Sequence, residues 1–280
     1  IALFLQMLAQ QARSALGGLP ERVVLGRPVH FVDDHPARDQ QAQEALRQAA
    51  RAAGFGEVSF QLEPIAAALD YEQRITQESL VLVVDIGGGT SDFSVVRLGP
   101  QRAGKADRSA DVLATTGVHI GGTDFDRKLS QARVMPLLGL GHIGPHGREV
   151  PSKVFHDLST WHLIQWRYAP QAVREAQALR SDYREPALHA RLMAVLHQRL
   201  GHRVAEAVEQ AKIGVSVHGH ATPVRLDWLD AAEPNLQALL SPDEMEHDLQ
   251  ALLAQVVACA RACLQLAGLS AQGTGVDAIY

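Results

Sequence analysis

Cysteine is scarce in this chain of 280 residues, with Cys259 and Cys263 as its only two. A fold stapled by disulfides needs more than one pair four residues apart, so we interpret both as small core-facing residues in a reducing compartment. The 13 histidines include no HExxH sequence and no paired Cys/His spacing. Isolated histidines are mostly structural, and a metal site built on them is the weaker hypothesis.

Aromatic residues make up only 5% of the chain, which leaves no stacking platform for nucleic acid bases. The 26 basic and 31 acidic residues are interspersed and give a formal charge of -5, so no charge surplus favours nucleic acid or an anionic membrane. The longest apolar stretches, such as 80–86, have the length of a strand rather than of a membrane span. We therefore expect a cytoplasmic globular protein with no nucleic-acid partner and no membrane partner.

Helix-period and strand-period patterns alternate along the chain and predict a mixed α/β protein. The strongest boundary signal is Ser241-Pro242-Asp243-Glu244, a capping box with proline in the first turn of a long final helix. A segment rich in Gly, Pro and His at 135–151 precedes a mostly helical stretch at 152–217. The predicted helices are 1–16, 38–53, 65–71, 123–132 and 241–267. The predicted strands are 58–62, 80–86, 92–98, 111–116 and 223–229, together with 22–31, which Pro28 breaks so that a strand runs into a turn.

The two ends of the chain favour a fragment of a longer protein. The first residue is Ile rather than Met, and 1–11 has the pattern of a helix already in progress. At the other end, 276–280 begins like a buried strand and is cut off. We therefore expect further sequence on both sides.

The sequence Asp85-Ile86-Gly87-Gly88-Gly89-Thr90-Ser91-Asp92 joins two predicted strands. Successive glycines reach the dihedrals that turn several backbone N–H groups toward one point, which makes a nest for a phosphate. A Walker loop or a dinucleotide fingerprint would instead open a helix. A plain hairpin turn is the structural alternative, but it needs only one or two glycines and no acid at the strand end.

The polar residues around the glycines suit phosphoryl chemistry. Asp85 ends an apolar strand, where a buried carboxylate is costly unless Mg²⁺ or its hydration shell balances the charge. Thr90 has a hydroxyl that can orient a water, and Asp92 has a carboxylate that can bind a cation or accept a proton. We predict that these three side chains, with the backbone of Gly87, Gly88 and Gly89, contact phosphate and cation.

The loop and its two strands resemble the second phosphate motif of the actin, sugar-kinase and heat-shock ATPase superfamily. Three further segments narrow the resemblance to the DnaK-type chaperones, the heat shock protein 70 family. Glu63-Pro64-Ile65-Ala66-Ala67-Ala68-Leu69-Asp70-Tyr71 resembles the hinge motif of that family, and 120–126 resembles its Leu-Gly-Gly-x-Asp-Phe-Asp segment. The segment 209–216 resembles the helix that holds the adenosine. All four occur in family order and at roughly family spacing.

The resemblance implies an actin-like ATPase fold of the ribonuclease-H-like kind, incomplete here, with two lobes that close over ATP or ADP and Mg²⁺. Residues 1–76 would be the later part of lobe I without its first phosphate loop, 77–120 and 241–280 the base of lobe II, and 121–240 its upper, mostly helical subdomain. The resemblance places Glu63 near the metal with Asp85 and Asp92. It places nucleotide contacts at Gly121, Gly122, Glu209, Lys212, Ile213 and Ser216.

Taken alone, several of these residues have simpler explanations. Glu63 could serve only as an acid that favours a helix dipole, and Gly121-Gly122 could be a turn before a helix, although N–H groups at a helix start also suit a phosphate. Lys212 alone would be an exposed helix lysine. Its neighbours Glu209 and Ser216, at i−3 and i+4 on one helix face, favour the functional interpretation.

Two segments depart from the family pattern. Pro28-Val29-His30-Phe31 stands where the family has Pro-Ala-Tyr-Phe, and 32–38 is reworked after it. The stretch 135–191 is unlike ordinary DnaK and somewhat longer. Both features resemble the divergent bacterial YegD-like chaperone homologues, which are believed to lack the peptide-binding domain.

Three hypotheses for function follow. The first is a nucleotide-dependent switch in a chaperone homologue, with slow ATP hydrolysis in the full-length protein and client or co-chaperone proteins as partners. The second is a small-molecule kinase of the same superfamily, which would need an acceptor-site aspartate and sugar-binding residues in lobe I. The third is a scaffold that binds ATP without hydrolysing it. We expect the fragment alone to bind ATP weakly and to be inactive.

Overall fold

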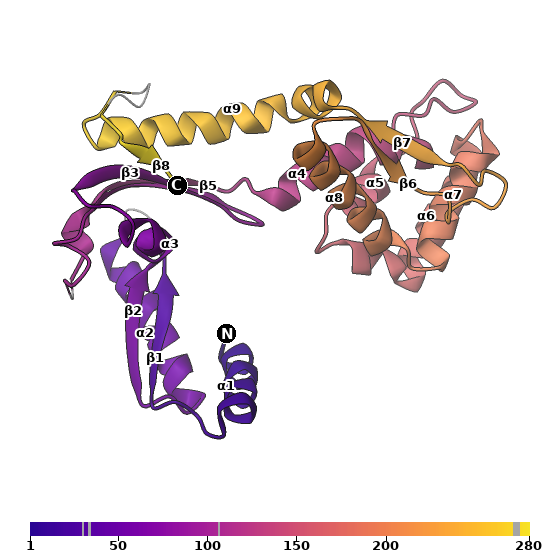
Figure 1. Ribbon diagram of the computed structural model, residues 1–280. Helices are drawn as coiled ribbons and strands as arrows, with labels where there is room; N and C mark the ends of the chain where they lie inside the picture. The colour runs from indigo at the N-terminus through magenta and orange to yellow at the C-terminus, as the bar shows by residue number, and fades with distance from the viewer. Residues whose placement is uncertain (30, 33–34, 106, 271–274) are drawn as a thin grey trace. The chain divides into compact units, whose positions relative to one another are not determined.

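The computed structural model of the chain describes residues 1–280 except 30, 33–34, 106 and 271–274 (Figure 1). It has the predicted mixed α/β character and divides into two compact units. Unit 1 consists of Ile1–Asp85, Asp92–Gly117 and Cys259–Tyr280, and unit 2 consists of Ile86–Ser91 and Val118–Ala258. Part of the segment that departs from the family pattern, His30 and 33–34, lies outside the described residues.

The first part of unit 1 alternates helix and strand. α1 (Ala2–Leu16) ends at Gly17, whose φ of 75° lies in the left-handed region that commonly terminates helices. β1 (Arg22–Arg27) and β2 (Glu57–Leu62) pair in parallel, and α2 (Pro36–Ala52) makes the connection that parallel strands require. Their apolar sides share one core, formed by Leu5, Ala9, Ala50, Ala53, Phe55 and Val58.

The strand predicted at 22–31, with its break at Pro28, is present as β1 and ends at Arg27, directly before that proline. Pro28 follows it and has no N–H with which to continue a ladder. The Arg27 side chain instead donates hydrogen bonds to the carbonyls of Pro28 at 2.9 Å and Val29 at 3.0 Å. It also pairs with Asp39 of α2 at 3.0 Å, so one guanidinium fastens the end of β1 to the next helix.

The second part of unit 1 is a four-stranded sheet with strand order β5-β4-β3-β8. Its strands are β3 (Ser79–Ile86), β4 (Ser91–Leu98), β5 (Val112–Val118) and β8 (Ala278–Ile279), and β8 runs parallel to β3. α3 (Glu63–Glu72) shares a core with this sheet, made of Ile65, Ala68, Val81, Val83, Val96 and Leu98. The predicted final strand is present, but its predicted burial is wrong for Ile279, which is 74% exposed because β8 lies at the end of the sheet.

Buried ion pairs tie the C-terminal end of α3 to the segment between β4 and β5. Arg108 is 7% exposed and binds both carboxylate oxygens of Glu72, each at 2.9 Å, as well as Asp111. Glu72 also accepts a hydrogen bond from the Gly99 amide at 2.9 Å. Burial raises the pKa of the Asp111 carboxyl, but the guanidiniums of Arg108 and Arg102 outweigh it and hold this pKa below its ordinary value. Charge as well as apolar contact therefore joins α3 to the sheet.

Unit 2 is mostly helical, which confirms the prediction for 152–217. Large side chains such as Phe155, Leu192 and Leu226 are fully buried in one core that extends from α4 to α9. The helices of this unit are α4 (Gly122–Leu129), α5 (Lys153–Leu158), α6 (Pro170–Ala178), α7 (Pro186–His197) and α8 (Gly201–His218), with a π-turn at Ser130–Val134 and 3-10 turns at Met135–Leu138, Ile164–Tyr168 and Leu179–Asp182.

A small antiparallel hairpin of β6 (Thr222–Arg225) and β7 (Gln237–Leu240) completes this unit. The strand predicted at 223–229 ends early, because the chain turns after Arg225 and the Leu229 amide donates to the Leu226 carbonyl at 2.8 Å. β7 has no counterpart among the predicted strands. Four residues are too few to establish a two-residue period in the sequence.

α9 (Pro242–Leu266) begins with the predicted capping box. The Ser241 amide donates to the Glu244 carboxylate at 2.9 Å, and the Glu244 amide donates to the Ser241 hydroxyl at 3.2 Å. By length and composition alone the helix is apolar enough to cross a membrane, with a mean hydropathy of 1.5 over an 18-residue window that is 22% buried. A single helix of this kind in the described part of the chain is weak support for a membrane span, since core helices of soluble proteins meet the same criteria.

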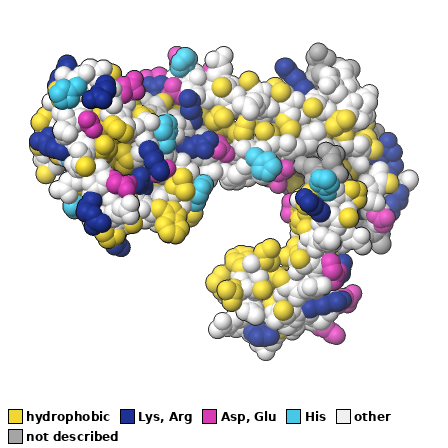
Figure 2. Space-filling view, turned by 180° about the vertical axis from the view of Figure 1, so that it is seen from behind, with side chains coloured by type: hydrophobic (Ala, Val, Ile, Leu, Met, Phe, Trp, Pro, Cys, Tyr) yellow, Lys and Arg dark blue, Asp and Glu magenta, His cyan; other side chains and the backbone are white. Residues whose placement is uncertain are grey.

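Hydrophobic side chains gather on the surface of α1 and along α9 (Figure 2). Leu3 and Phe4 are exposed on α1, and Val257 and Leu266 are exposed on α9. The lobe boundaries implied by the resemblance, at 1–76, at 77–120 with 241–280, and at 121–240, stay a prediction.

Candidate functional site

The glycine loop between β3 and β4 is closed by a hydrogen bond from the Gly87 amide to the Thr90 carbonyl at 2.9 Å. The start of α4 binds this loop. The Gly122 amide donates to the Gly87 carbonyl at 2.9 Å, and the Thr123 amide donates to the Gly88 carbonyl at 2.8 Å. The Thr123 hydroxyl donates to the same Gly88 carbonyl at 2.6 Å. Two of the segments selected from the sequence are therefore in direct contact.

Close packing explains why the residue before α4 is a glycine. A Cβ on Gly121 would lie 2.6 Å from the Gly89 nitrogen and 2.7 Å from the Gly87 oxygen, closer than a Cβ can approach backbone atoms. The Ser91 hydroxyl donates to the Ile120 carbonyl at 2.7 Å and holds the neighbouring residue in place. The loop and the turn pack backbone against backbone, which only glycine permits.

The predicted anion nest is not adopted in this structure. None of Gly87, Gly88 and Gly89 has a φ in the left-handed region, whereas a nest alternates right-handed and left-handed residues. A Cβ on Gly88 or Gly89 would meet no atom within 4 Å. These glycines therefore leave one side of the loop open to a ligand, and this open approach is what they supply.

The backbone N–H groups at the start of α4 are already engaged. The Gly121 amide donates to the carboxylate of Asp124 at 3.1 Å, and the Gly122 amide donates to the loop. In this arrangement the two glycines hold the loop rather than offer free donors. Their assignment as phosphate contacts stays a prediction.

Three carboxylates predicted to manage the metal belong to unit 1. Glu63 begins α3, Asp85 lies near the end of β3, and Asp92 lies near the start of β4. Burial, and then the negative charges of Asp85 and Asp92, raise the pKa of the Glu63 carboxyl above its ordinary value. A Cβ on Gly26 of β1 would lie 3.4 Å from Glu63 Oε1, so the Glu63 side chain lies over this glycine. The structure thus brings the three acids close enough for their charges to interact.

The prediction that burial of the Asp85 carboxylate attracts a cation is wrong. Asp85 and Ile86 are exposed, because the burial of β3 ends at Val84, and a desolvated carboxylate is not what would attract an ion there. Mutual repulsion among the acids is the better reason, and oxygen ligands suit Mg²⁺. In the described residues no group of three metal-ligating side chains converges closely enough to hold an ion directly. Since Mg²⁺ keeps several of its waters, these acids fit it through its hydration shell.

The predicted adenosine face lies on α8. Lys212 is half-buried and pairs with Asp126 of α4 at 2.8 Å. A Cβ on Gly122 would lie 3.9 Å from Lys212 Nζ, so the ammonium lies near the start of α4 and the glycine loop bound to it. Burial raises the pKa of the Asp126 carboxyl, Lys212 lowers it, and the charge of Glu209 raises it, with a net shift upward.

The other members of this face are accessible. Glu209, Ile213 and Ser216 are exposed, and the Ser216 hydroxyl donates to the Lys212 carbonyl at 2.9 Å. Asp126 was not among the predicted site residues, although it belongs to the 120–126 segment. A lone acid and a lone lysine 86 positions apart give no local signal that they pair, and only the fold brings them together.

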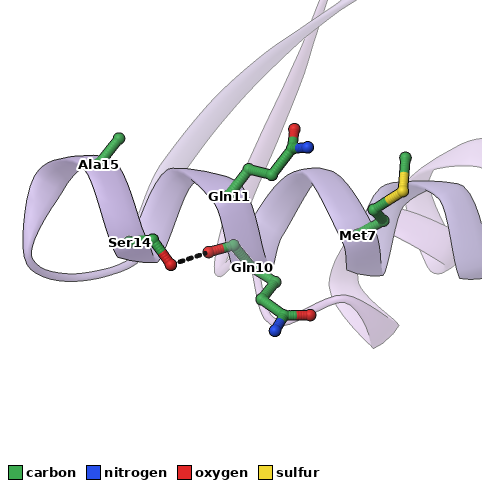
Figure 3. Close-up of a pocket in the computed structure, with 5 residues that line it drawn as sticks. All are labelled: Met7, Gln10, Gln11, Ser14 and Ala15. Carbon is green, nitrogen blue, oxygen red and sulfur yellow. Dashed lines mark hydrogen bonds between the residues drawn. The ribbon is translucent and has the colours of Figure 1, made fainter.

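A shallow surface depression along α1 is not a candidate site. Met7, Gln10, Gln11, Ser14 and Ala15 line it, and all five belong to one helix (Figure 3). The Ser14 hydroxyl donates to the Gln10 carbonyl at 3.1 Å. No charged side chain converges on it among these lining residues, so it offers a ligand little beyond a helix surface.

Residues 1–135 match the family model described as Hsp70 protein. This N-terminal part is Hsp70-like. The chain is 38% identical over 128 residues to the chaperone protein HscA of Pectobacterium atrosepticum, which covers 45% of this chain and 18% of that protein. It is 37% identical over 130 residues to the chaperone protein DnaK of Thermosipho melanesiensis, which covers 46% of this chain and 20% of that protein.

The chain spans about a fifth of the length of these curated relatives. The Hsp70-like part contains the segment that resembles the hinge motif, with Glu63, as well as the glycine loop and the start of α4. The match ends at residue 135, where the Gly-, Pro- and His-rich segment begins. The resemblance of 209–216 to the adenosine helix and the closer likeness to YegD-like homologues both stay predictions.

Proposed function

We propose that the chain binds ATP or ADP with Mg²⁺ as part of the nucleotide-binding domain of an Hsp70-type chaperone homologue. The observation that carries this proposal is the glycine loop held at the start of α4, where the Gly122 and Thr123 amides bind its carbonyls. Lys212 lies near the same helix start, paired with Asp126. A glycine loop with one open side suits a polyphosphate, and the Hsp70-like part includes this loop.

Different residues are proposed to contact the metal, the attacking water and the adenosine. Bound Mg²⁺ supplies positive charge that offsets the phosphate oxygens. Glu63, Asp85 and Asp92 would hold Mg²⁺ through its waters, and the Thr90 hydroxyl would orient a water for attack on the phosphate. The adenosine contacts are on the exposed face of α8, at Glu209, Lys212, Ile213 and Ser216.

The biological role we propose is a nucleotide-dependent switch in the whole protein. The curated relatives are chaperones by name, and client or co-chaperone proteins are the corresponding partners. ATP shifts the equilibrium between conformations by its differential affinity for them, and slow hydrolysis resets it. Neither a kinase nor a purely scaffolding role gains support from any contact in the described residues.

Nucleotide titration of the 280-residue chain, followed by amide NMR, tests the proposal. We expect millimolar MgADP and MgATP to shift the signals of Gly88, Gly89 and Ser216 saturably. Lys212→Ala should weaken binding by about tenfold, because a charge-assisted contact is lost. Lys128→Ala, which removes an exposed lysine of α4, is the matched control and should leave the affinity unchanged. Absence of saturable shifts in the loop, or an equal loss in the Lys128 variant, would contradict the proposal.

A further inference from the structure

A cavity of about 370 Å³ lies within unit 2, between α4, the turn after α5, and α8. Its volume is at the lower end of the range of small-molecule sites. Asp126 lines it from α4, Trp161 from the turn, and His202, Ala205, Glu206 and Glu209 from α8. The cavity continues the α8 face of Glu209 toward the N-terminus of that helix. Of the proposed nucleotide contacts, Glu209 lines the cavity, whereas Lys212, Ile213 and Ser216 do not.

One wall of the cavity is aromatic. Trp161 is 62% exposed although it borders the cavity, so most of the indole is free for a ligand. The His202 ring meets it edge-on, with centroids 5.6 Å apart and planes at 79°. This contact orients the indole and leaves ring surface uncovered. The negative face of an indole attracts cations, most strongly of all aromatic side chains.

The cavity is also lined by acidic side chains. Glu206 and Glu209 form no ion pair within the described parts of the chain. Asp126 Oδ1 is buried and receives no well-oriented hydrogen bond, so its 2.8 Å contact with Lys212 is an ion pair only. Three carboxylates with one nearby ammonium leave a net negative charge beside the indole. An anionic ligand is disfavoured here, and a cation is favoured.

We propose that this cavity binds a small organic cation of the amidinium or guanidinium type, with its flat apolar part on Trp161 and its charge on Glu206 and Glu209. A planar fork of N–H donors matches a carboxylate in two parallel hydrogen bonds, and a flat cation also stacks on an aromatic face. The inference goes beyond nucleotide binding and does not depend on it, because the ligand has the opposite charge.

Benzamidine is a suitable probe, because it is a flat cation at neutral pH and benzamide is its neutral isostere. In ligand-observed NMR and calorimetry on the 280-residue chain, we expect saturable benzamidine binding that weakens as salt is raised. Benzamide should bind at least about tenfold more weakly, since it lacks the charge. Equal binding of the two compounds would overturn the proposal.

Matched variants locate the site. Trp161→Ala and Glu206→Gln should each weaken benzamidine binding by about fivefold. Trp166→Ala removes an indole that is 67% exposed but does not line the cavity, and Glu246→Gln neutralises an exposed acid of α9. Both controls should bind like the parent chain. Equal losses in all four variants would show non-specific attraction to an acidic surface and would overturn the proposal.

The benzamidine experiment and the nucleotide titration can succeed or fail independently of each other. A chain that binds benzamidine but gives no loop shifts with MgADP would support the cation site and contradict the proposed function. The reverse result would contradict the cation site alone. Amide spectra of Trp161→Ala that match the parent outside the cavity would show that any loss of binding is local rather than a failure to fold.

Discussion

Gly121 lies so close to the glycine loop that a Cβ on it would come within 2.6 Å of the Gly89 nitrogen. The near atoms are all backbone, so no flexible side chain can move aside to make room. The hydrogen bonds from the Gly122 and Thr123 amides to the loop carbonyls hold the same two segments together. The position of the loop and the start of α4 are therefore set together, within unit 2.

Replacing this glycine tests that coupling. Gly121→Ala should lower the free energy of unfolding by about 1–3 kcal/mol, because an overpacked backbone contact must separate. It should also shift the amide signals of Gly87 and Gly89. Urea unfolding and NMR measure the two effects. Gly18→Ala is the control, since a Cβ there would meet nothing within 4 Å. Unchanged loop signals in the Gly121 variant would contradict the contact.

Breaking the ion pair of Lys212 and Asp126 should lower the free energy of unfolding by an amount that depends on pH. Lys212→Met should cost about 1–2 kcal/mol at neutral pH, because it leaves a largely buried carboxylate without its counter-charge. The pKa of Asp126 is already raised by burial and should rise further without the lysine. A raised acid pKa gives stability at low pH that is lost as pH rises through it, so the cost of the substitution should fade as pH falls below the raised pKa of Asp126.

Urea unfolding at several pH values measures this effect. The double variant Asp126→Asn with Lys212→Met should lose less than the sum of the two single variants, since no buried charge remains. A loss that is the same at acidic and neutral pH would show that the lysine contributes packing rather than charge.

The acids of unit 1 predict a coupled titration. Burial and the charges of Asp85 and Asp92 raise the pKa of Glu63, so Glu63 holds its proton more tightly in the folded state. Its contribution to stability is complete below the ordinary glutamate pKa and is lost as pH rises through the raised value. Asp85→Asn should lower the Glu63 pKa, as carboxyl-carbon NMR can measure. Asp70→Asn, on the exposed side of α3, is the control, and an equal shift there would argue against specific coupling.

The capping box of α9 gives a local prediction. Ser241→Ala removes the hydroxyl that accepts from the Glu244 amide and should cost about 1 kcal/mol in the free energy of unfolding. Ser152→Ala is the control, because Ser152 precedes α5 without a side-chain cap. Thermal or urea unfolding measures both. A cost in the control as large as in the Ser241 variant would mean that the hydroxyl bond contributes nothing particular.

Structural features that depend on a few neighbouring residues could be predicted from the sequence. The capping box at Ser241, the helix end at Gly17 and the strands on either side of the glycine loop depend on residues a few positions apart. Pro28 is equally local, and β1 ends directly before it, as the proline predicts.

Features that depend on distant contacts were not predictable. Asp126 pairs with Lys212, and Gly121 fits against Gly89, only because the fold brings separate segments together. Gly121 was predicted as a phosphate contact, and the structure adds a packing reason for this glycine that no spacing rule contains. Trp161 is largely exposed beside a cavity, and neither its exposure nor the cavity can be inferred from a single tryptophan in the sequence.

The pair of Arg108 and Glu72 has a mechanical consequence. α3 carries Glu63 at its first position and Glu72 at its last, and Arg108 grips the far end with two hydrogen bonds of 2.9 Å. The pair fixes the C-terminal end of α3 to the segment between β4 and β5. Glu63, at the other end of the same helix, is thereby connected to the strands of Asp85 and Asp92 by a charge contact as well as by the shared apolar core.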